Sequence, residues 1–299
     1  MENLKENKKK NKCIVFSSNK MNLAKLSSNL LFPLIILLIV IIQIKSKNNT
    51  IIIEVNKKGK QNILYSGFNK NLFVYINDQE KYISKIQINV GAITDNIKLV
   101  WNTSLTSCAN MFNGLTNIKA INFIDFDFSL VTSMSNMFCN CKNLVNVSFN
   151  CLNTSNVKTM YRMFFTCQNL ISLNFTGFDT SQVTTMQEMF SGCQKLSSLN
   201  LTDINTSNVK TMFKMFFNCK NLLSLNLIGF DNSQVTTMQE MFSGCQNLIS
   251  LNLIDFNTPN VKTMLKMFFN CQNLISLNLI DFDNSQVTTM QEMFSVVKI

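Results

Sequence analysis

The sequence contains no histidine. Histidine is the commonest general base and a frequent metal ligand, so its absence excludes every Ser–His or Cys–His dyad and most hydrolase mechanisms. The motifs GxGxxG, GxxxxGK[ST] and HExxH, which mark dinucleotide, phosphate and zinc sites, are also missing. We therefore expect a protein that is not an enzyme and that holds no cofactor and no metal ion.

The net charge of +10 is unevenly distributed. Residues 1–47 carry nine Lys and two Glu, whereas residues 101–299 carry eleven basic and eleven acidic residues. The positive excess therefore surrounds an apolar run near the N-terminus, where a role in targeting explains it better than a nucleic-acid groove. We expect no nucleic-acid partner.

The apolar run is residues 26–44, LSSNLLFPLIILLIVIIQI, which is 19 residues without a charge. A bilayer crossing needs roughly 17–25 residues. The preceding lysines predict that residues 1–25 are a basic cytosolic tail and that the rest of the chain lies across the membrane. A cleaved signal peptide starting at Met21 is the competing interpretation, although no A-x-A-like site follows Ile44, and a buried core helix is a third. The first two place the repeats outside the cell or in a lumen.

A Met-Phe pair recurs every 26 residues, from Met111-Phe112 to Met293-Phe294, without a single insertion. A register kept in this way means that every unit stacks on its neighbour in the same manner, which is typical of a solenoid. We assign residues 105–299 to the array, which holds about seven and a half repeats.

Within a repeat, Val235, Met238, Met241 and Phe242 fall on one stripe of a short predicted helix. Ser233 precedes it as an N-cap. Gly and Asn tolerate a left-handed helix stop, and one of them follows the stripe in most units: Asn140, Gly192, Asn218, Gly244 and Asn270.

The spacing of Leu248, Leu251 and Leu253 predicts a short strand after this helix. Residues 48–101 contain β-like runs such as IIIEV, NILYS, LFVYI and IKLVW, which we expect to cover the first repeat as a β-rich N-terminal cap. The predicted fold is an α/β, leucine-rich-repeat-type solenoid with a short strand and a short helix per repeat, preceded by the cap and by an N-terminal hydrophobic helix over residues 26–44.

The L-x-x-L-x-L core resembles leucine-rich repeats. The full unit, V-x-x-M-x-x-M-F-x-x-C-x-x-L-x-x-L-x-L-x-x-F-x-T-S, resembles the BspA-like leucine-rich-repeat surface proteins of bacteria and protists, and the likeness covers Leu105 to Phe294. The first unit departs from it, since Leu115 replaces the repeat Cys and Cys108 a repeat Met. The resemblance implies a non-catalytic cell-surface protein used in adhesion or recognition, with an extracellular protein or a glycan as partner. A structural coat or antigen without a specific ligand is the alternative.

One row of side chains is a candidate ligand surface, because it occupies the outward position of each predicted strand. A solvated or strand-stabilising ladder is the alternative. The row is Asn174, Asn200, Asn226, Asn252 and Asn278.

A second row alternates in charge, because the units alternate between VKTM-x-[KR]-MFF and VTTMQEMFS. We predict that it is a stacking charge ladder that fixes the order of the units. A solvated face with weak pairs is the alternative. The row is Arg162, Glu188, Lys214, Glu240, Lys266 and Glu292.

A third row contains cysteines, which we predict to be small buried hydrophobes. Disulfides between adjacent turns are an alternative, and zinc is a weaker one. The row is Cys141, Cys167, Cys193, Cys219, Cys245 and Cys271.

Asp and Asn alternate at the position after the Phe that ends each strand, as at Asp179 and Asn205. They predict Asx-type turns, with a calcium row as the alternative. The sequence stops inside the eighth unit after SVVKI. We expect either a truncated fragment or an end covered by a partner, and self-association through this uncapped end.

Overall fold

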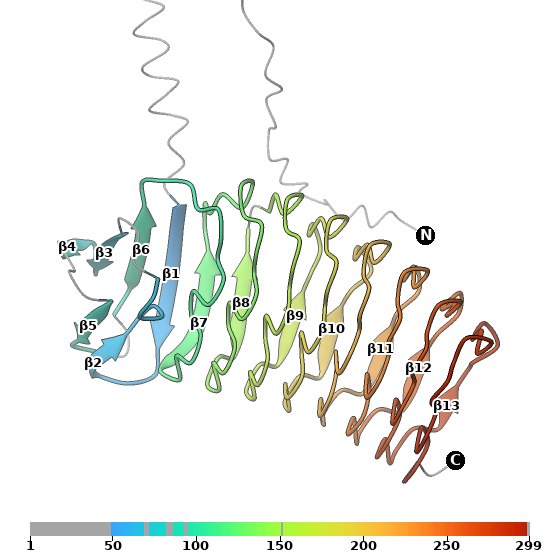
Figure 1. Cartoon of the computed structure of the whole chain (residues 1–299). Helices are drawn as coiled ribbons and strands as arrows, with labels where there is room; N and C mark the ends of the chain where they lie inside the picture. Colours follow the sequence, from blue (N-terminus) through green and yellow to red (C-terminus); the bar gives the residue numbers. More distant parts are fainter. Residues whose placement is uncertain (1–48, 69–71, 82–85, 93–94, 151, 298–299) are drawn as a thin grey trace, which may run out of the picture. The chain divides into compact units, whose positions relative to one another are not determined.

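The computed structural model describes residues 49–68, 72–81, 86–92, 95–150 and 152–297. These residues form β-strands and turns, and they contain no helix (Figure 1). The predicted α/β class is therefore wrong for the described residues: the repeats form a β-solenoid. The predicted N-terminal helix at residues 26–44 lies outside the described residues. No apolar helix of the length that a bilayer crossing requires occurs within the described ranges.

The first six strands precede the repeats. They are β1 (Asn49–Val55), β2 (Gly59–Asn62), β3 (Leu72–Ile76), β4 (Gln79–Lys81), β5 (Gln87–Val90) and β6 (Ile97–Trp101). Strands β1, β3 and β6 coincide with predicted runs, whereas most of the run NILYS lies after β2. The main sheet has the order β4-β3-β6-β1-β7-β8, in which β1 lies antiparallel to both β6 and β7.

Strand β1 joins these strands to the repeats. Ile51 pairs with Phe123 and Ile53 with Ile121 of the first repeat strand, so the antiparallel sheet continues into the parallel one without a break. Ile51 and Ile53 are fully buried. Their alternation with exposed or half-exposed residues is the period that a half-buried strand requires.

Each repeat then contributes one short strand to the solenoid (Figure 1). These strands are β7 (Ile118–Phe123), β8 (Asn146–Phe149), β9 (Ser172–Asn174), β10 (Ser198–Asn200), β11 (Ser224–Asn226), β12 (Ser250–Asn252) and β13 (Ser276–Leu277). Strands β7 and β8, strands β9 and β10, and strands β11 to β13 pair in parallel and in register at the 26-residue spacing, for example Leu225 with Leu251 and Leu251 with Leu277. The predicted strand position is thus confirmed.

The other side of each coil is formed by residues 236–245 and their equivalents, which we call the turn segment. The predicted helix of each repeat lies here and is wrong. The N–H groups of Met238, Glu240, Phe242 and Gly244 donate to carbonyl oxygens of the next coil at 2.8–3.0 Å. An α-helix would instead need each N–H to bond the carbonyl four residues earlier in the same coil.

Two left-handed residues in each turn segment also exclude a helix. Glu240 has a φ of 54° and Gly244 a φ of 78°. Tight turns around them, closed by Met241 N–H to Met238 O and by Ser243 N–H to Glu240 O, bring the chain back to the core side every three or four residues. Apolar residues on such turns have the same spacing as on a helix, which explains the incorrect prediction. The Asn and Gly residues expected to be left-handed are so, with φ of 56–78°.

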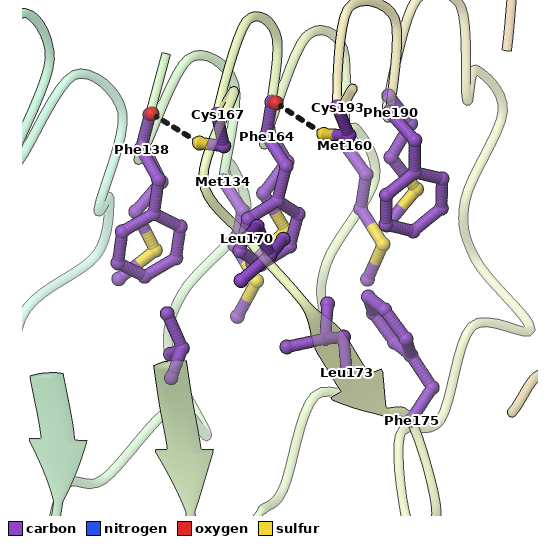
Figure 2. Packing of buried hydrophobic residues seen from close by; sticks show 14 of the residues in the cluster. Met134, Phe138, Met160, Phe164, Cys167, Leu170, Leu173, Phe175, Phe190 and Cys193 are labelled. Atoms are coloured by element: carbon purple, nitrogen blue, oxygen red, sulfur yellow. Dashed lines mark hydrogen bonds between the residues drawn. The ribbon is translucent and has the colours of Figure 1, made fainter. Parts of the chain in front are cut away.

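The core consists of columns of identical side chains between the strand and the turn segment (Figure 2). The Phe column is the most regular: Phe190, Phe216 and Phe242 stack with ring centroids 5.5–5.6 Å apart and planes within 7° of parallel. Columns of Met, Cys and Leu are likewise buried. Since no coil can cover its own columns, each depends on its neighbours for burial.

Candidate recognition surface

The coils offer a regular outer surface on the strand side. In the last three coils the relevant stretches are residues 223–228, 249–254 and 275–280, each containing one strand. Leu225 and Leu251 of these stretches are 4 % exposed and point into the core, whereas the Ser and Asn on either side of them are exposed or half-exposed. We call the outward side chains of these stretches and of their equivalents the strand face.

The predicted ligand row lies on the strand face. Asn174, Asn200, Asn226 and Asn278 are exposed and Asn252 is half-exposed. Each Oδ1 atom accepts a hydrogen bond from the backbone N–H two residues later, at 2.9–3.1 Å. The row therefore closes five equivalent Asx turns where the strands end. The side-chain amide N–H groups of Asn226, Asn252 and Asn278 have no partner among the described residues, which leaves them available to a ligand.

An Asn ladder also exists, but at a position that sequence analysis missed. Asn169 donates to Asn143, Asn247 to Asn221 and Asn273 to Asn247, at 3.2–3.3 Å between side-chain amides of adjacent coils. The signal was the recurrent Asn before the first Leu of the strand, which Lys195 interrupts in one coil.

Two apolar columns border the Ser and Asn side chains in the last three coils. All six side chains are at least 45 % exposed. The first column is Leu223, Ile249 and Ile275, and the second is Ile228, Ile254 and Ile280. A shallow cavity of ≈ 470 Å³ lies along the first column, between it and the Asn247–Asn273 ladder. Sequence analysis did not single out these columns.

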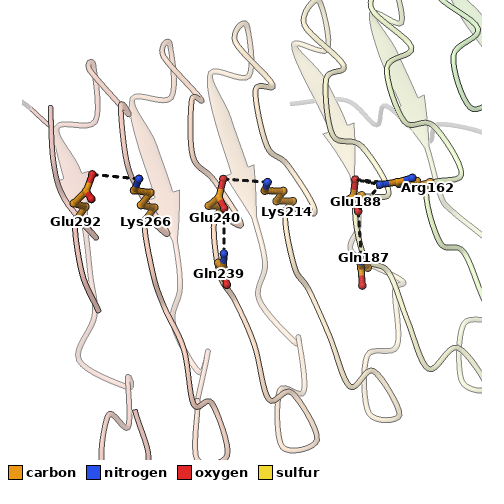
Figure 3. Close-up of polar contacts among 8 residues, drawn as sticks. All are labelled: Arg162, Gln187, Glu188, Lys214, Gln239, Glu240, Lys266 and Glu292. Atoms are coloured by element: carbon orange, nitrogen blue, oxygen red, sulfur yellow. Dashed lines mark hydrogen bonds and ion pairs between the residues drawn. The ribbon is translucent and has the colours of Figure 1, made fainter. Parts of the chain in front are cut away.

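The predicted charge ladder divides into discrete pairs (Figure 3). Arg162 binds Glu188 through three N–H···O contacts of 2.8–3.1 Å, Lys214 lies 3.3 Å from Glu240, and Lys266 lies 3.4 Å from Glu292. Among the described residues, no ion pair joins Glu188 to Lys214 or Glu240 to Lys266. Each ion pair therefore joins two adjacent coils, so that the coils are connected in pairs.

Aromatic rings flank the cations of these pairs. The Arg162 guanidinium lies 5.0 Å from the ring centre of Tyr161 and 4.8 Å from that of Phe165. Lys214 lies between Phe213 and Phe217 at 5.1 and 4.9 Å. In the intervening coils, Gln187 and Gln239 donate to the carboxylates of Glu188 and Glu240 instead. Each carboxylate thus receives support from its own coil and from the preceding one.

A steric contact follows the same two-coil alternation. Gly244 is left-handed, and a Cβ atom there would collide with the side chain of Asn218 in the preceding coil. Likewise a Cβ atom at Gly192 would meet the Thr166 backbone and hydroxyl at 3.2–3.3 Å. Larger residues in one coil thus occupy the space that glycine leaves in the next. Residues 157–208 and 209–260 each hold one such pair of coils, and we call each pair a block.

Buried threonines bridge the coils between the strand and the turn segment. Thr180 and Thr206 each donate a hydroxyl hydrogen bond to a carbonyl oxygen of the next coil, at 2.8 and 2.9 Å. Asn232 occupies this column one coil later and is 2 % exposed. Neither polar atom of the Asn232 side chain has a hydrogen-bond partner within the described part of the chain. This is a local defect in the array.

The Asx turns predicted after each strand are confirmed at Asp127, Asn153, Asp179, Asn205, Asp231 and Asp283. Asn257 is the exception, because Pro259 has no N–H to donate. The hydroxyl and N–H of Ser181 hold the pKa of Asp179 below its ordinary value. Within the described residues, no cluster of three or more Cys, Asp or Glu side chains is arranged to hold a metal ion.

The six cysteines of the predicted row are buried and carry free thiols. Each Sγ donates to the carbonyl oxygen of the Phe 29 residues earlier, as from Cys193 to Phe164 at 3.1 Å (Figure 2). Burial raises the pKa of the Cys193 and Cys271 thiols to about 12 and that of Cys139 to about 11. Buried thiols held in this protonated form are poor nucleophiles.

The fold and these surfaces define a β-solenoid repeat protein. Residues 106–226 and 219–298 match the family described as "Mycoplasma protein of unknown function, DUF285". The two matches together cover about two thirds of the chain, which therefore belongs to this family. No curated protein and no solved structure matches the chain.

Proposed function

We propose that the protein is a non-catalytic, BspA-like surface protein whose solenoid binds an extracellular protein or glycan through the strand face. The observation that carries this proposal is the strand face itself. It repeats one set of exposed Ser and Asn side chains at the spacing of adjacent strands, about 4.8 Å. Such an even surface suits an extended partner, since solenoids use these surfaces for binding.

The Asn row can be tested without disturbing the Asx turns. Asn226→Asp and Asn252→Asp keep the oxygen that accepts the N–H two residues later, but replace the free amide N–H groups with a negative charge. Lys158→Ala and Lys210→Ala, at exposed positions of the turn segment, are the matched controls.

The measurement is binding of the full chain to arrays of glycans and extracellular proteins. We expect reproducible binding that the two Asp substitutions weaken at least tenfold and that the two Ala substitutions leave unchanged. Binding that is equally insensitive to both pairs would contradict use of the strand face. A chain that binds nothing would favour the structural coat or antigen.

We further propose that residues 26–44 export the repeats, either as a signal anchor or as a cleaved signal. Support comes from the apolar run and the lysines before it. N-terminal sequencing of the protein from its native host tests this. Loss of residues 1–46 would indicate cleavage, and their retention an anchor. Retention in a chain that proteases cannot reach on intact cells would contradict surface exposure.

A further inference from the structure

The strand face changes in character along the array. In the last three described coils its stretches read LSLNLI, ISLNLI and ISLNLI, with large aliphatic residues at both ends. Two coils earlier, the equivalent stretches at 171–176 and 197–202 read ISLNFT and SSLNLT. Thr176, Ser197 and Thr202 therefore stand where Ile228, Leu223 and Ile254 would lie. The solenoid fold is the same in both places, so stacking does not require the aliphatic side chains.

The surface between the two apolar columns contains no charged side chain. It presents Ser224, Ser250 and Ser276 beside Asn226, Asn252 and Asn278. Among the described residues, neither the serine hydroxyls nor the amide N–H groups of these three asparagines have a hydrogen-bond partner. The acidic residues Asp255 and Asp281 follow the second column and lie outside it.

This combination is self-complementary. A charged partner would have to leave water without meeting an opposite charge, which is unfavourable. A second copy of the same surface brings apolar columns against apolar columns. When the two-fold axis runs along the array, it also sets amide donors opposite serine oxygens. No ionised group within the patch would then be desolvated.

The patch also has sufficient size for a weak pair. Six aliphatic side chains that are about half exposed or more offer on the order of 400 Å² of apolar surface. The Ser and Asn rows add polar area, so the total approaches the roughly 800 Å² per partner of a standard interface. The largest apolar patch on a typical monomeric protein is of about this size and is often functional.

We propose that two copies of the chain associate face to face through strands β11, β12 and β13, related by a two-fold axis through β12. The pairing uses the same face as the proposed function and deepens it, because it names a second copy as one partner. A two-fold axis that lies in the contact plane and passes through the centre of the patch places β12 opposite β12. A two-fold contact uses the same surface of both copies, so the assembly is complete as a dimer.

Cysteine cross-linking of the full chain tests this directly. Ser250→Cys with Asn252→Cys places two thiols on β12, and either orientation of the two-fold axis brings one of them opposite a thiol of the second copy. Ser198→Cys with Asn200→Cys on β10 is the matched control, because β10 has the same Ser-Leu-Asn sequence but is bordered by Ser197 and Thr202. Each is treated with a short bis-maleimide, with the unsubstituted chain in parallel.

We expect a cross-linked species of twice the chain mass for the β12 variant, at least fivefold above that of the β10 variant. Adding Ile249→Lys and Ile254→Lys should abolish it. Equal yields from β10 and β12, or species larger than two chains, would overturn the proposal, the latter pointing to open-ended stacking through the coil ends. Loss of ligand binding in the Asn→Asp variants is a separate readout, so either proposal can fail alone.

Discussion

The two sides of each coil are built differently. The turn segment bonds its N–H groups to the next coil at every second residue and, in the coils up to Cys271, buries its Met, Phe and Cys columns. The strand side has a ladder of only two or three residues in the later coils and exposes aliphatic side chains. The buried columns, charge pairs and glycine contacts gather on the first side, whereas the second side keeps its Ser and Asn rows constant and changes its flanking apolar columns along the array. Stability therefore resides mainly in the turn segment, which leaves the strand face free to vary with the partner.

The Phe column should give the largest contrast between the two sides. Phe216→Ala removes a ring that is stacked between Phe190 and Phe242 in a fully buried site, so we expect a loss of about 3–5 kcal/mol in the free energy of unfolding. Asn226→Ala on the strand side should change it by less than about 1 kcal/mol. Urea unfolding followed by circular dichroism measures both. Similar losses at the two positions would show that the sides contribute equally.

Alkaline pH should weaken the turn segment next. The unfolded chain loses its thiol protons near pH 9, whereas the folded chain retains them up to about pH 12 at Cys193. The thiol therefore contributes stability that is fully present below pH 9 and is lost as the pH rises toward 12. Cys193→Ala should make the fall of the unfolding free energy shallower by about 1.4 kcal/mol per pH unit. An unchanged slope between pH 9 and 12 would show that this thiol titrates in the folded state as it does in the unfolded one.

The defect at Asn232 offers a gain in stability. Asn232→Thr restores the residue type whose hydroxyl bridges adjacent coils elsewhere in the column, and it removes two buried polar atoms without partners. We expect the unfolding free energy to rise by about 1–2 kcal/mol. Asn284→Thr, at the exposed equivalent position two coils later, is the control and should have no effect. A gain at both positions would point to intrinsic propensity rather than to hydrogen bonding.

The charge pairs should have the smallest effect. Glu240→Lys places a third cation in the row next to Lys214, and we expect a loss of about 1 kcal/mol at low salt, decreasing as salt is added. Glu240→Gln, which only removes the attraction, should cost less. Thermal unfolding at several ionic strengths measures both. A loss that salt does not change would mean that packing around Phe213 and Phe217, and not charge, determines the effect.

The sequence alone predicted the period, the strands and the columns of side chains, because one unit repeated without insertion leaves a single way to stack. The helices were wrong because tight turns around two left-handed residues reproduce the helical spacing of Met238, Met241 and Phe242. Asn and Gly at the second left-handed position, such as Gly244, are residue types that indicate a turn. The first left-handed position, at Glu240 and its equivalents, could not be predicted, because charged residues rarely adopt φ near 54°.

The candidate surfaces were predicted less completely. The Asn row was placed correctly on the strand side, but its Asx turns depend on where each strand ends, which sequence patterns locate poorly. The charge row was predicted as a continuous ladder, whereas within the described part of the chain Lys214 forms an ion pair with Glu240 and none with Glu188. Asn232 was overlooked, since nothing in its sequence context distinguishes a satisfied buried amide from one that has no partner.

The pairing of coils into blocks limits how such a gene can change. Duplicating or deleting a whole block keeps every cation beside its carboxylate and every glycine beneath a larger neighbour. Adding or removing a single coil within the alternating part of the array would instead set like charges side by side. Related arrays should therefore differ in length by multiples of 52 residues, which means that coils are gained or lost in pairs.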